Sequence, residues 1–406
     1  VVRVVTPGTV IDAALLSTEQ ARYLMAVYPD QKKKRVGLSF IDISTGDFQF
    51  TEIPSQDMQD GIRSEAARYH PSECIIPAGA GEDLVRFLHS IVPLVSSQDS
   101  SLFAKASAEE VLCRQFTISN PEDLPCAGYV AGTIAAGAAL AYAQKTQFDS
   151  LSHIRSVHRS DIGSHLVLDA VTLRNLEVLQ NIRDRTEEGT LVATIDLTLT
   201  PMGRRLLRKR IAAPLLDPNV INRRLDAVSY FIDRSAVRHD VRTRIHRFPD
   251  LERIAGRISY GNASPRDLVT LAAANDAVKR LKTLFSTEDG IPDELSGAIA
   301  GIRDITPLAD LITRAIVQDP PALIRKGGVI QDGYHEELDH LRTISRNGKQ
   351  WIADLEQQEK ERTGIKSLKI KYNAVFGYYI EITKANLASV PDDYERRQYS
   401  AHARQP

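Results

Sequence analysis

One long helix constrains this chain more than any other feature of its sequence. The pattern predicts it from Asp332 to Thr363, about 32 residues, and Gly364 favours the left-handed conformation that ends helices. At 1.5 Å per residue the helix is ~48 Å long. Its apolar residues form a narrow stripe with a 3–4 spacing, typical of a coiled-coil seam that needs a partner helix: Tyr334, Leu338, Leu341, Ile344, Trp351, Ile352 and Leu355.

The segment after this helix predicts strands and no returning helix. Apolar or aromatic residues alternate with polar ones over residues 368–372 and again over residues 378–383, which is the period of a strand. Residues 1–20 begin without a methionine and contain a Thr-Pro-Gly turn. We therefore expect the chain to be cut from a longer protein at both ends, with residues 1–20 as a linker.

Residues 21–150 predict an α/β domain. Residues 36–43 and 48–50 flank a Ser-Thr-Gly-Asp turn and predict a β-hairpin, and residues 73–76 predict a short buried strand. Residues 62–69 and 128–144 predict helices. The run from Cys126 to Gln144 is uncharged, but it is too weakly apolar for a membrane span, so we interpret it as a buried helix.

After about residue 155 the pattern becomes helical. At five positions a capping residue precedes a proline at the first position of a predicted helix: Asn120, Thr200, Asp217, Ser264 and Thr306. Apolar residues recur on one face of the predicted helices after Asp217 and Ser264, over residues 221–232 and 268–285.

Composition narrows the class of protein. The 406 residues are 43% hydrophobic and 25% charged, which suits a chain of two to four folded domains. Only three cysteines occur, without CxxC spacing, and no secretory signal is seen; both features favour a cytoplasmic protein. The net charge of −1 alternates along the chain: −6 over residues 1–150, +6 over 151–260, −4 over 261–360 and +3 over 361–406.

Motifs for catalysis are mostly excluded. His335 and His340 are five apart, which puts the two rings on different faces of a helix and disfavours a zinc site. No glycine-rich loop is followed by Lys-Ser/Thr, so we expect no cofactor and no ATP hydrolysis in this chain. Asp42 leaves a metal-dependent nuclease open as an alternative. The nearest further carboxylates are Asp47, Glu65 and Glu73.

Cations with interleaved aromatic residues gather near the C-terminus and are the best binding signal. Tyr372, Phe376, Tyr378 and Tyr379 lie among them. Basic residues on the exposed face of a small sheet suit phosphate contacts, which hold DNA without reading its bases. The candidate DNA-binding residues are Lys369, Lys371, Lys384, Arg396 and Arg397.

The chain resembles the MutS family of DNA mismatch repair proteins over nearly its whole length. The resemblance is carried by short segments in the expected order: Thr-Pro-Gly-Thr at residues 6–9, Leu-Val-Leu-Asp-Ala-Val-Thr-Leu-Arg-Asn-Leu-Glu at 166–177, Thr-Pro-Met-Gly-Arg-Arg-Leu-Leu-Arg at 200–208, Asp-Leu-Glu-Arg at 250–253, Ser-Pro-Arg-Asp-Leu at 264–268, Thr-Gly-Ile-Lys-Ser-Leu-Lys at 363–369 and Phe-Gly-Tyr-Tyr-Ile-Glu-Ile at 376–382.

This resemblance implies a multi-domain layout, α/β followed by a mainly α part. Residues 1–20 would be the linker from a mismatch-reading domain, 21–150 an RNase H-like connector, 151–361 the helical core and lever, and 362–406 part of a β clamp that grips duplex DNA. Family members form homodimers around double-stranded DNA, bind ATP and magnesium through a C-terminal ATPase domain, and recruit MutL, which the connector helps to contact.

The sequence departs from the family pattern in several places. The resemblance assigns the family's Phe-x-Glu mismatch wedge to an upstream domain. The Walker A loop and the returning lever helix are not found in residues 1–406, and the residues after Gln398 differ from the usual continuation. We therefore expect a DNA-gripping, signal-transmitting portion that is not itself an enzyme. The alternatives are a helical adaptor without DNA contact and the metal-dependent nuclease.

Overall fold

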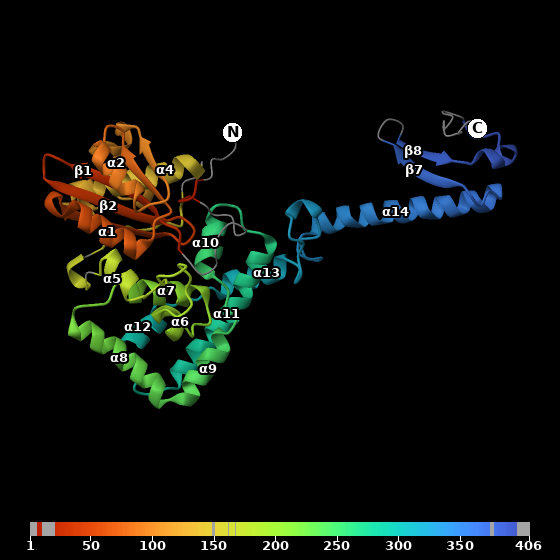
Figure 1. Ribbon diagram of the computed structural model, residues 1–406. Helices are drawn as coiled ribbons and strands as arrows, with labels where there is room; N and C mark the ends of the chain where they lie inside the picture. Colours follow the sequence, from red (N-terminus) through yellow and green to blue (C-terminus); the bar gives the residue numbers. More distant parts are fainter. Residues whose placement is uncertain are drawn as a thin grey trace. The chain divides into compact units, whose positions relative to one another are not determined.

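The computed structural model describes residues 6–9, 21–147, 151–160, 162–166, 168–373 and 377–395 (Figure 1). Two compact units divide the chain, residues 1–329 and residues 330–406, and each is described by itself. In the first unit a mixed sheet precedes a series of helices. The second unit consists of a long helix followed by a β-hairpin.

The sheet of the first unit has six strands in the order β5-β4-β1-β2-β3-β6. Antiparallel pairing joins β1 to β2 and β2 to β3, whereas β4 pairs parallel to β1, β5 to β4 and β6 to β3. The predicted hairpin and buried strand are confirmed as β2–β3 and β4. The strands are β1 (Leu24–Asp30), β2 (Arg35–Asp42), β3 (Asp47–Pro54), β4 (Glu73–Pro77), β5 (Val95–Gln98) and β6 (His158–Arg159).

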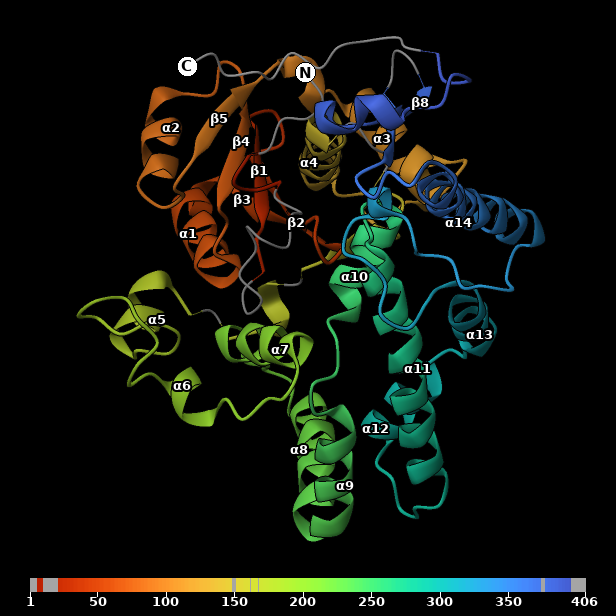
Figure 2. The ribbon, with the colours of Figure 1, turned by 90° about the vertical axis from the view of Figure 1, so that its right-hand side faces the viewer.

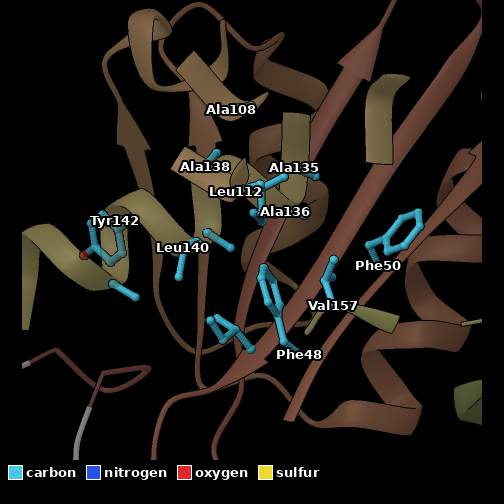
Figure 3. Packing of buried hydrophobic residues seen from close by; sticks show 14 of the residues in the cluster. Phe48, Phe50, Ala108, Leu112, Ala135, Ala136, Ala138, Leu140, Tyr142 and Val157 are labelled. Carbon is cyan, nitrogen blue, oxygen red and sulfur yellow. The ribbon is translucent and has the colours of Figure 1, made fainter. Parts of the chain in front are cut away.

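Helices cover both faces of this sheet (Figure 2). On one face α1 (Met58–Tyr69) and α2 (Glu82–His89) enclose a core with Met25, Val27 and Phe40. On the other, α3 (Lys105–Phe116) and α4 (Val130–Gln147) pack on alternate residues of the same strands, among them Phe48 and Phe50 (Figure 3). This alternation follows from the two-residue period of a strand.

The weakly apolar helix predicted at residues 128–144 is confirmed as α4, and its small residues explain its position. Fourteen of its eighteen residues are buried. A Cβ on Gly37 of β2 would lie 1.9 Å from the carbonyl oxygen of Ala131, and a Cβ on Gly137 would lie 2.4 Å from the Cα of Ala108. Glycine therefore permits backbone contacts that no larger residue allows.

Nine helices follow in the described part of the first unit. The predicted caps are confirmed at Thr200, Asp217 and Ser264, and Ser264 forms a complete capping box with Asp267. The helices are α5 (Ala170–Asn175), α6 (Leu191–Ile195), α7 (Pro201–Ala212), α8 (Pro218–Asp233), α9 (Ser235–Ile245), α10 (Leu251–Ser259), α11 (Pro265–Ser286), α12 (Asp293–Gly301) and α13 (Thr306–Ala315).

Of the other two predicted caps, Asn120 is confirmed as a cap, though not of an α-helix, and Thr306 is wrong. Asn120 accepts from the amide of Glu122, but the element that follows is a single 3-10 turn, Pro121–Asp123, and not an α-helix. Thr306 is the first residue of α13, and no side chain caps that helix. The reason is a competing acceptor: Asp304 Oδ1 accepts from both the amide and the hydroxyl of Thr306, at 2.9 and 2.5 Å.

The two predicted apolar faces have different environments. Along α11, Asn275 and Phe285 are buried. Along α8, Leu225, Val228 and Ile232 are exposed. The helical period was therefore read correctly in both, but only the α11 face is covered by the described part of the first unit.

The second unit contains α14 (Glu336–Thr363), β7 (Lys369–Asn373), β8 (Gly377–Glu381) and a 3-10 helix, Lys384–Ser389. The helix begins four residues later than predicted, because His335 is its cap and accepts from the amide of Leu338 at 3.3 Å. It ends as predicted at Gly364, whose φ is 69°. Its 28 residues give a length of ~42 Å. Trp351 on the apolar stripe is 64% exposed.

Candidate nucleic-acid interface

The β7–β8 hairpin carries two of the five predicted cations, Lys369 and Lys371, on one of its faces. Lys369 pairs across the strands with Glu381, and Lys371 pairs with Tyr379. Directly opposed residues of an antiparallel pair lie on the same face, so these four side chains share one surface. The two lysines are two residues apart on β7 and both are exposed.

Glu381 already neutralises one of the two lysines. The ammonium of Lys371 lies 2.5 Å from Glu381 Oε2, and both side chains are about half exposed (49% and 41%). This hydrogen bond, with the negative charge of Glu381, raises the pKa of Lys371. A phosphate that binds Lys371 must therefore displace a carboxylate, whereas Lys369 has no such partner among the ion pairs of the described residues.

The other candidate residues lie beyond the hairpin. Lys384 is exposed at the first position of the 3-10 helix that follows β8. Arg396 and Arg397 lie outside the described residues. The structure thus brings Lys369 and Lys371 together on one strand and positions Lys384 after the neighbouring strand, without an ion pair of its own in the described chain.

The opposite face of the hairpin is aromatic. Tyr372 and Tyr378 are directly opposed, with their rings edge to face and 5.1 Å apart. They are 65% and 62% exposed. Strand alternation puts these two rings on the face opposite the lysines, whereas Tyr379 lies on the lysine face, directly across from Lys371.

Polar contacts tie the hairpin to the end of α14. Glu356 Oε2 accepts from the amide of Ile370 at 2.9 Å, which joins the helix to β7. Arg362 forms an ion pair with Asp393 at 3.0 Å, and its guanidinium lies 5.4 Å from the centre of the Tyr394 ring. Sequence reasoning missed both contacts, because neither residue pair follows a local spacing rule.

The carboxylates proposed for a nuclease are engaged in other contacts and do not converge. Asp42 accepts from Ser44, and burial raises its pKa. Glu65 lies near Arg68, and Glu73 binds Tyr142. In the described part of the chain no three His, Cys, Asp or Glu side chains are grouped so that they could hold a metal ion. The two-metal arrangement is therefore not found among these residues.

Asp47 forms a hydrogen bond and an ion pair that connect the sheet to α7. Its Oδ2 atom accepts from Tyr23 at 2.5 Å and pairs with Lys209 of α7 at 2.7 Å. Burial pushes the pKa of Asp47 upward, but the Lys209 ammonium and hydrogen bonds from Tyr23 and Gln49 hold it below its usual value. The turn after β2 is thereby joined to the helical part of the same unit.

A cavity of about 720 Å³ lies between the sheet and α7, in the size range of small-molecule sites. Several cations line it, but most have acidic partners. Arg205 donates to both carboxylate oxygens of Asp250 at 2.7 Å, and Lys209 pairs with Asp47. Most of the positive charge that lines the cavity is therefore neutralised by neighbouring carboxylates, which gives weak support to an anion site.

The glycines at 132 and 137 lie inside α4, where a phosphate-binding loop is impossible. Among the described residues, no helix combines the length and the apolar character needed to cross a membrane.

Comparison with known proteins assigns the chain to a family. The family model of MutS domain II matches residues 22–155, and that of MutS domain III matches residues 171–388, more than half of the chain. The DNA mismatch repair protein MutS of Methanosarcina acetivorans is 42% identical over 418 residues, which cover 99% of this chain and 46% of that protein. The MutS of Salinibacter ruber is 40% identical over 401 residues, covering 98% of this chain and 43% of that protein.

The chain belongs to the MutS family of DNA mismatch repair proteins. It spans a little under half the length of the relatives cited here. Strands β1 to β5 and helices α1 to α4 fall within the match to domain II, and β6 lies just beyond it. The helical series, α14 and the hairpin fall mostly within the match to domain III.

Proposed function

We propose that this chain is the DNA-gripping and signal-transmitting portion of a MutS-type mismatch recognition protein. In this proposal residues 1–20 are the linker from a mismatch-reading domain, 21–150 the RNase H-like connector, 151–361 the helical core and lever, and 362–406 part of the clamp. The family assignment supports it, because the match to MutS domain II precedes the match to MutS domain III along the chain, as the proposed layout requires.

The clamp role is carried by one observation, the exposed face of the hairpin. Lys369 and Lys371 are exposed on β7, and Lys384 is exposed in the 3-10 helix after β8, although Lys371 is paired with Glu381. Lysine donates to phosphate as a point charge and carries no base preference. We therefore propose binding to the backbone of double-stranded DNA, with no discrimination between matched and mismatched duplexes by this chain.

The remaining functions belong to the longer protein. We propose that the connector contributes to MutL binding, that the whole protein forms a cytoplasmic homodimer, and that its ATP and magnesium bind outside residues 1–406. This chain would then be no enzyme. Calorimetry with ATP and magnesium tests that part of the proposal: we expect no saturable heat, and micromolar ATP binding by this chain contradicts it.

The DNA proposal is tested by duplex binding over a salt series. The variant K369A/K371A/K384A removes the three described candidate lysines. Each phosphate contact contributes about −0.9 to the slope of log K against log salt, so the slope should weaken by roughly 2 to 3. The control K32A/K33A/K105A removes three lysines that are exposed in the α/β part and should leave the slope unchanged.

Each alternative function predicts a different result. If both triple variants bind as the parent does, the hairpin lysines are an ordinary solvated face and the adaptor interpretation gains support. Preference of the parent for mismatched DNA contradicts the claim that this chain does not read bases. Cleavage that depends on a divalent metal and is lost in D42N supports the nuclease.

A further inference from the structure

A buried carboxylate in the sheet has donors that come from a distant part of the chain. Glu73 opens β4 and its side chain is fully buried. A carboxylate removed from water is costly unless hydrogen bonds replace its hydration. Three neutral groups donate to it: the hydroxyl of Tyr142 at 2.7 Å, the amide of Gly8 at 3.0 Å, and the hydroxyl of Thr6.

Two of these donors belong to one tight turn, residues 6–9. The amide of Thr9 donates to the carbonyl of Thr6 at 2.9 Å, and the amide of Thr6 donates to Thr9 Oγ1 at 3.1 Å. The turn thereby directs the Thr6 hydroxyl and the Gly8 amide toward the same oxygen, Oε2 of Glu73.

The α4 helix completes the surroundings of the turn. Gln147 donates from its side-chain amide to the carbonyl of Thr9, and Thr9 itself is fully buried. Burial, together with the hydrogen bond to Glu73, raises the pKa of Tyr142 to about 12. Tyr142 therefore keeps its proton and donates to Oε1 of Glu73 at neutral pH.

Shape selects the residue at position 8. A Cβ on Gly8 would lie 2.8 Å from the Cβ of Glu73 and 3.2 Å from the Cα of Leu24. The φ of Gly8 is not in the left-handed region, so the requirement for glycine is one of space and not of backbone conformation. The site accepts a Thr-x-Gly-Thr turn and excludes the same turn with alanine.

We infer that Glu73, Tyr142 and Gln147 form a peptide-binding socket whose ligand is a Thr-x-Gly-Thr turn, supplied here by the chain's own residues 6–9. The ligand is recognised by a hydroxyl and a glycine N–H that converge on one carboxylate oxygen. The socket fixes residues 6–9 to the α/β part, so that they are not a free linker. This inference is independent of the proposed DNA binding.

The first test measures amide hydrogen exchange of residues 6–9 in the full chain. In the parent, the amides of Thr6, Gly8 and Thr9 should exchange slowly, because all three donate hydrogen bonds. G8A should accelerate their exchange at least about tenfold, since opening then costs little. G81A is the matched control, because a Cβ at Gly81 meets nothing within 4 Å.

E73Q changes the acceptor carboxylate of the socket and leaves the turn itself unchanged. The carboxylate accepts from Thr6 and Gly8 on one oxygen and from Tyr142 on the other. A carboxamide has only one acceptor oxygen, so the amides of residues 6–9 should again exchange faster. Its control is E82Q, which changes an exposed glutamate at the start of α2. G8A keeps the inference testable if E73Q fails to fold, because it leaves the sheet residues unchanged.

A second test supplies the ligand in trans. A peptide of residues 4–11 is added at millimolar concentration to G8A and to the parent, and its binding is followed by NMR of the labelled peptide. We expect saturable binding to G8A and binding roughly tenfold weaker or more to the parent, whose own turn competes at high effective concentration. Binding to neither protein, or unchanged exchange in G8A, overturns the inference.

Discussion

Replacing Glu381 by glutamine should strengthen DNA binding, and this is the sharpest test of the hairpin surface. Glu381 holds the Lys371 ammonium at 2.5 Å on the face proposed to meet phosphate. Its carboxylate both occupies the cation and repels a phosphate. E381Q keeps the size of the side chain and removes the charge, so Lys371 becomes available without a competing anion.

The magnitude follows from counterion release. One further phosphate contact contributes about −0.9 to the slope of log K against log salt. Relative to a reference near 1 M salt, this corresponds to a gain of about 10^0.9, or roughly eightfold, at 0.1 M. The change has the opposite sign to that of K369A/K371A/K384A, so loss of folding cannot imitate it.

Fluorescence anisotropy with a labelled duplex measures both the affinity and the slope. E337Q is the control, since it removes an equal charge near the start of α14, some 40 Å of helix away from Gly364. An E381Q protein with the parent's affinity and slope refutes the reasoning, because Lys371 would then have no phosphate to meet.

Three further substitutions test the first unit. G256A should destabilise the unit by about 1–3 kcal/mol in urea unfolding, because a Cβ would lie 2.7 Å from the carbonyl oxygen of Ser44. A Cβ at Gly297 meets nothing within 4 Å, so G297A should instead stabilise its helix by about 0.5–1 kcal/mol. Equal effects of the two substitutions contradict the steric argument. D267N should cost about 1 kcal/mol at pH 7 through loss of the capping box. Burial pushes the pKa of Asp267 upward, but hydrogen bonds from Arg257 and Ser264 hold it below its usual value, so the native state favours the charged form. The contribution is present above the unfolded pKa of about 3.9 and is lost as the pH falls through the lower folded value. Melting temperatures of parent and variant should therefore converge below about pH 4, and a gap that widens there contradicts the sign.

Local patterns predicted most elements because each depends on neighbouring residues. Alternation identified β2 and β3, and the glycine at 364 marked the end of α14. Two Thr-Pro pairs gave different outcomes for a local reason as well. Thr200 caps α7 by accepting from the amide of Gly203, whereas the hydroxyl of Thr306 donates to Asp304, two residues before it. An acidic residue at that position is a signal that the cap rule alone does not include.

Contacts between distant segments could not be predicted. The bond from Gly8 to Glu73 spans 65 residues and needs the strand, the turn and α4 to be in place. The ion pair of Lys371 and Glu381 depends on the register of β7 against β8, which places Glu381 opposite Lys369 and diagonal to Lys371. The sequence therefore predicted which face carries the lysines, but not that a carboxylate lies among them.

The same hairpin has little core of its own. Ile365 and Leu368 are buried beside the end of α14, while Tyr372 and Tyr378 on the aromatic face stay exposed. An isolated two-stranded hairpin is marginally stable in water. The hydrogen bond from the Ile370 amide to Glu356 therefore matters more here than it would within a larger sheet. It follows that the attachment of β7 to α14 depends on this bond, and that DNA affinity should respond to changes at this end of the helix.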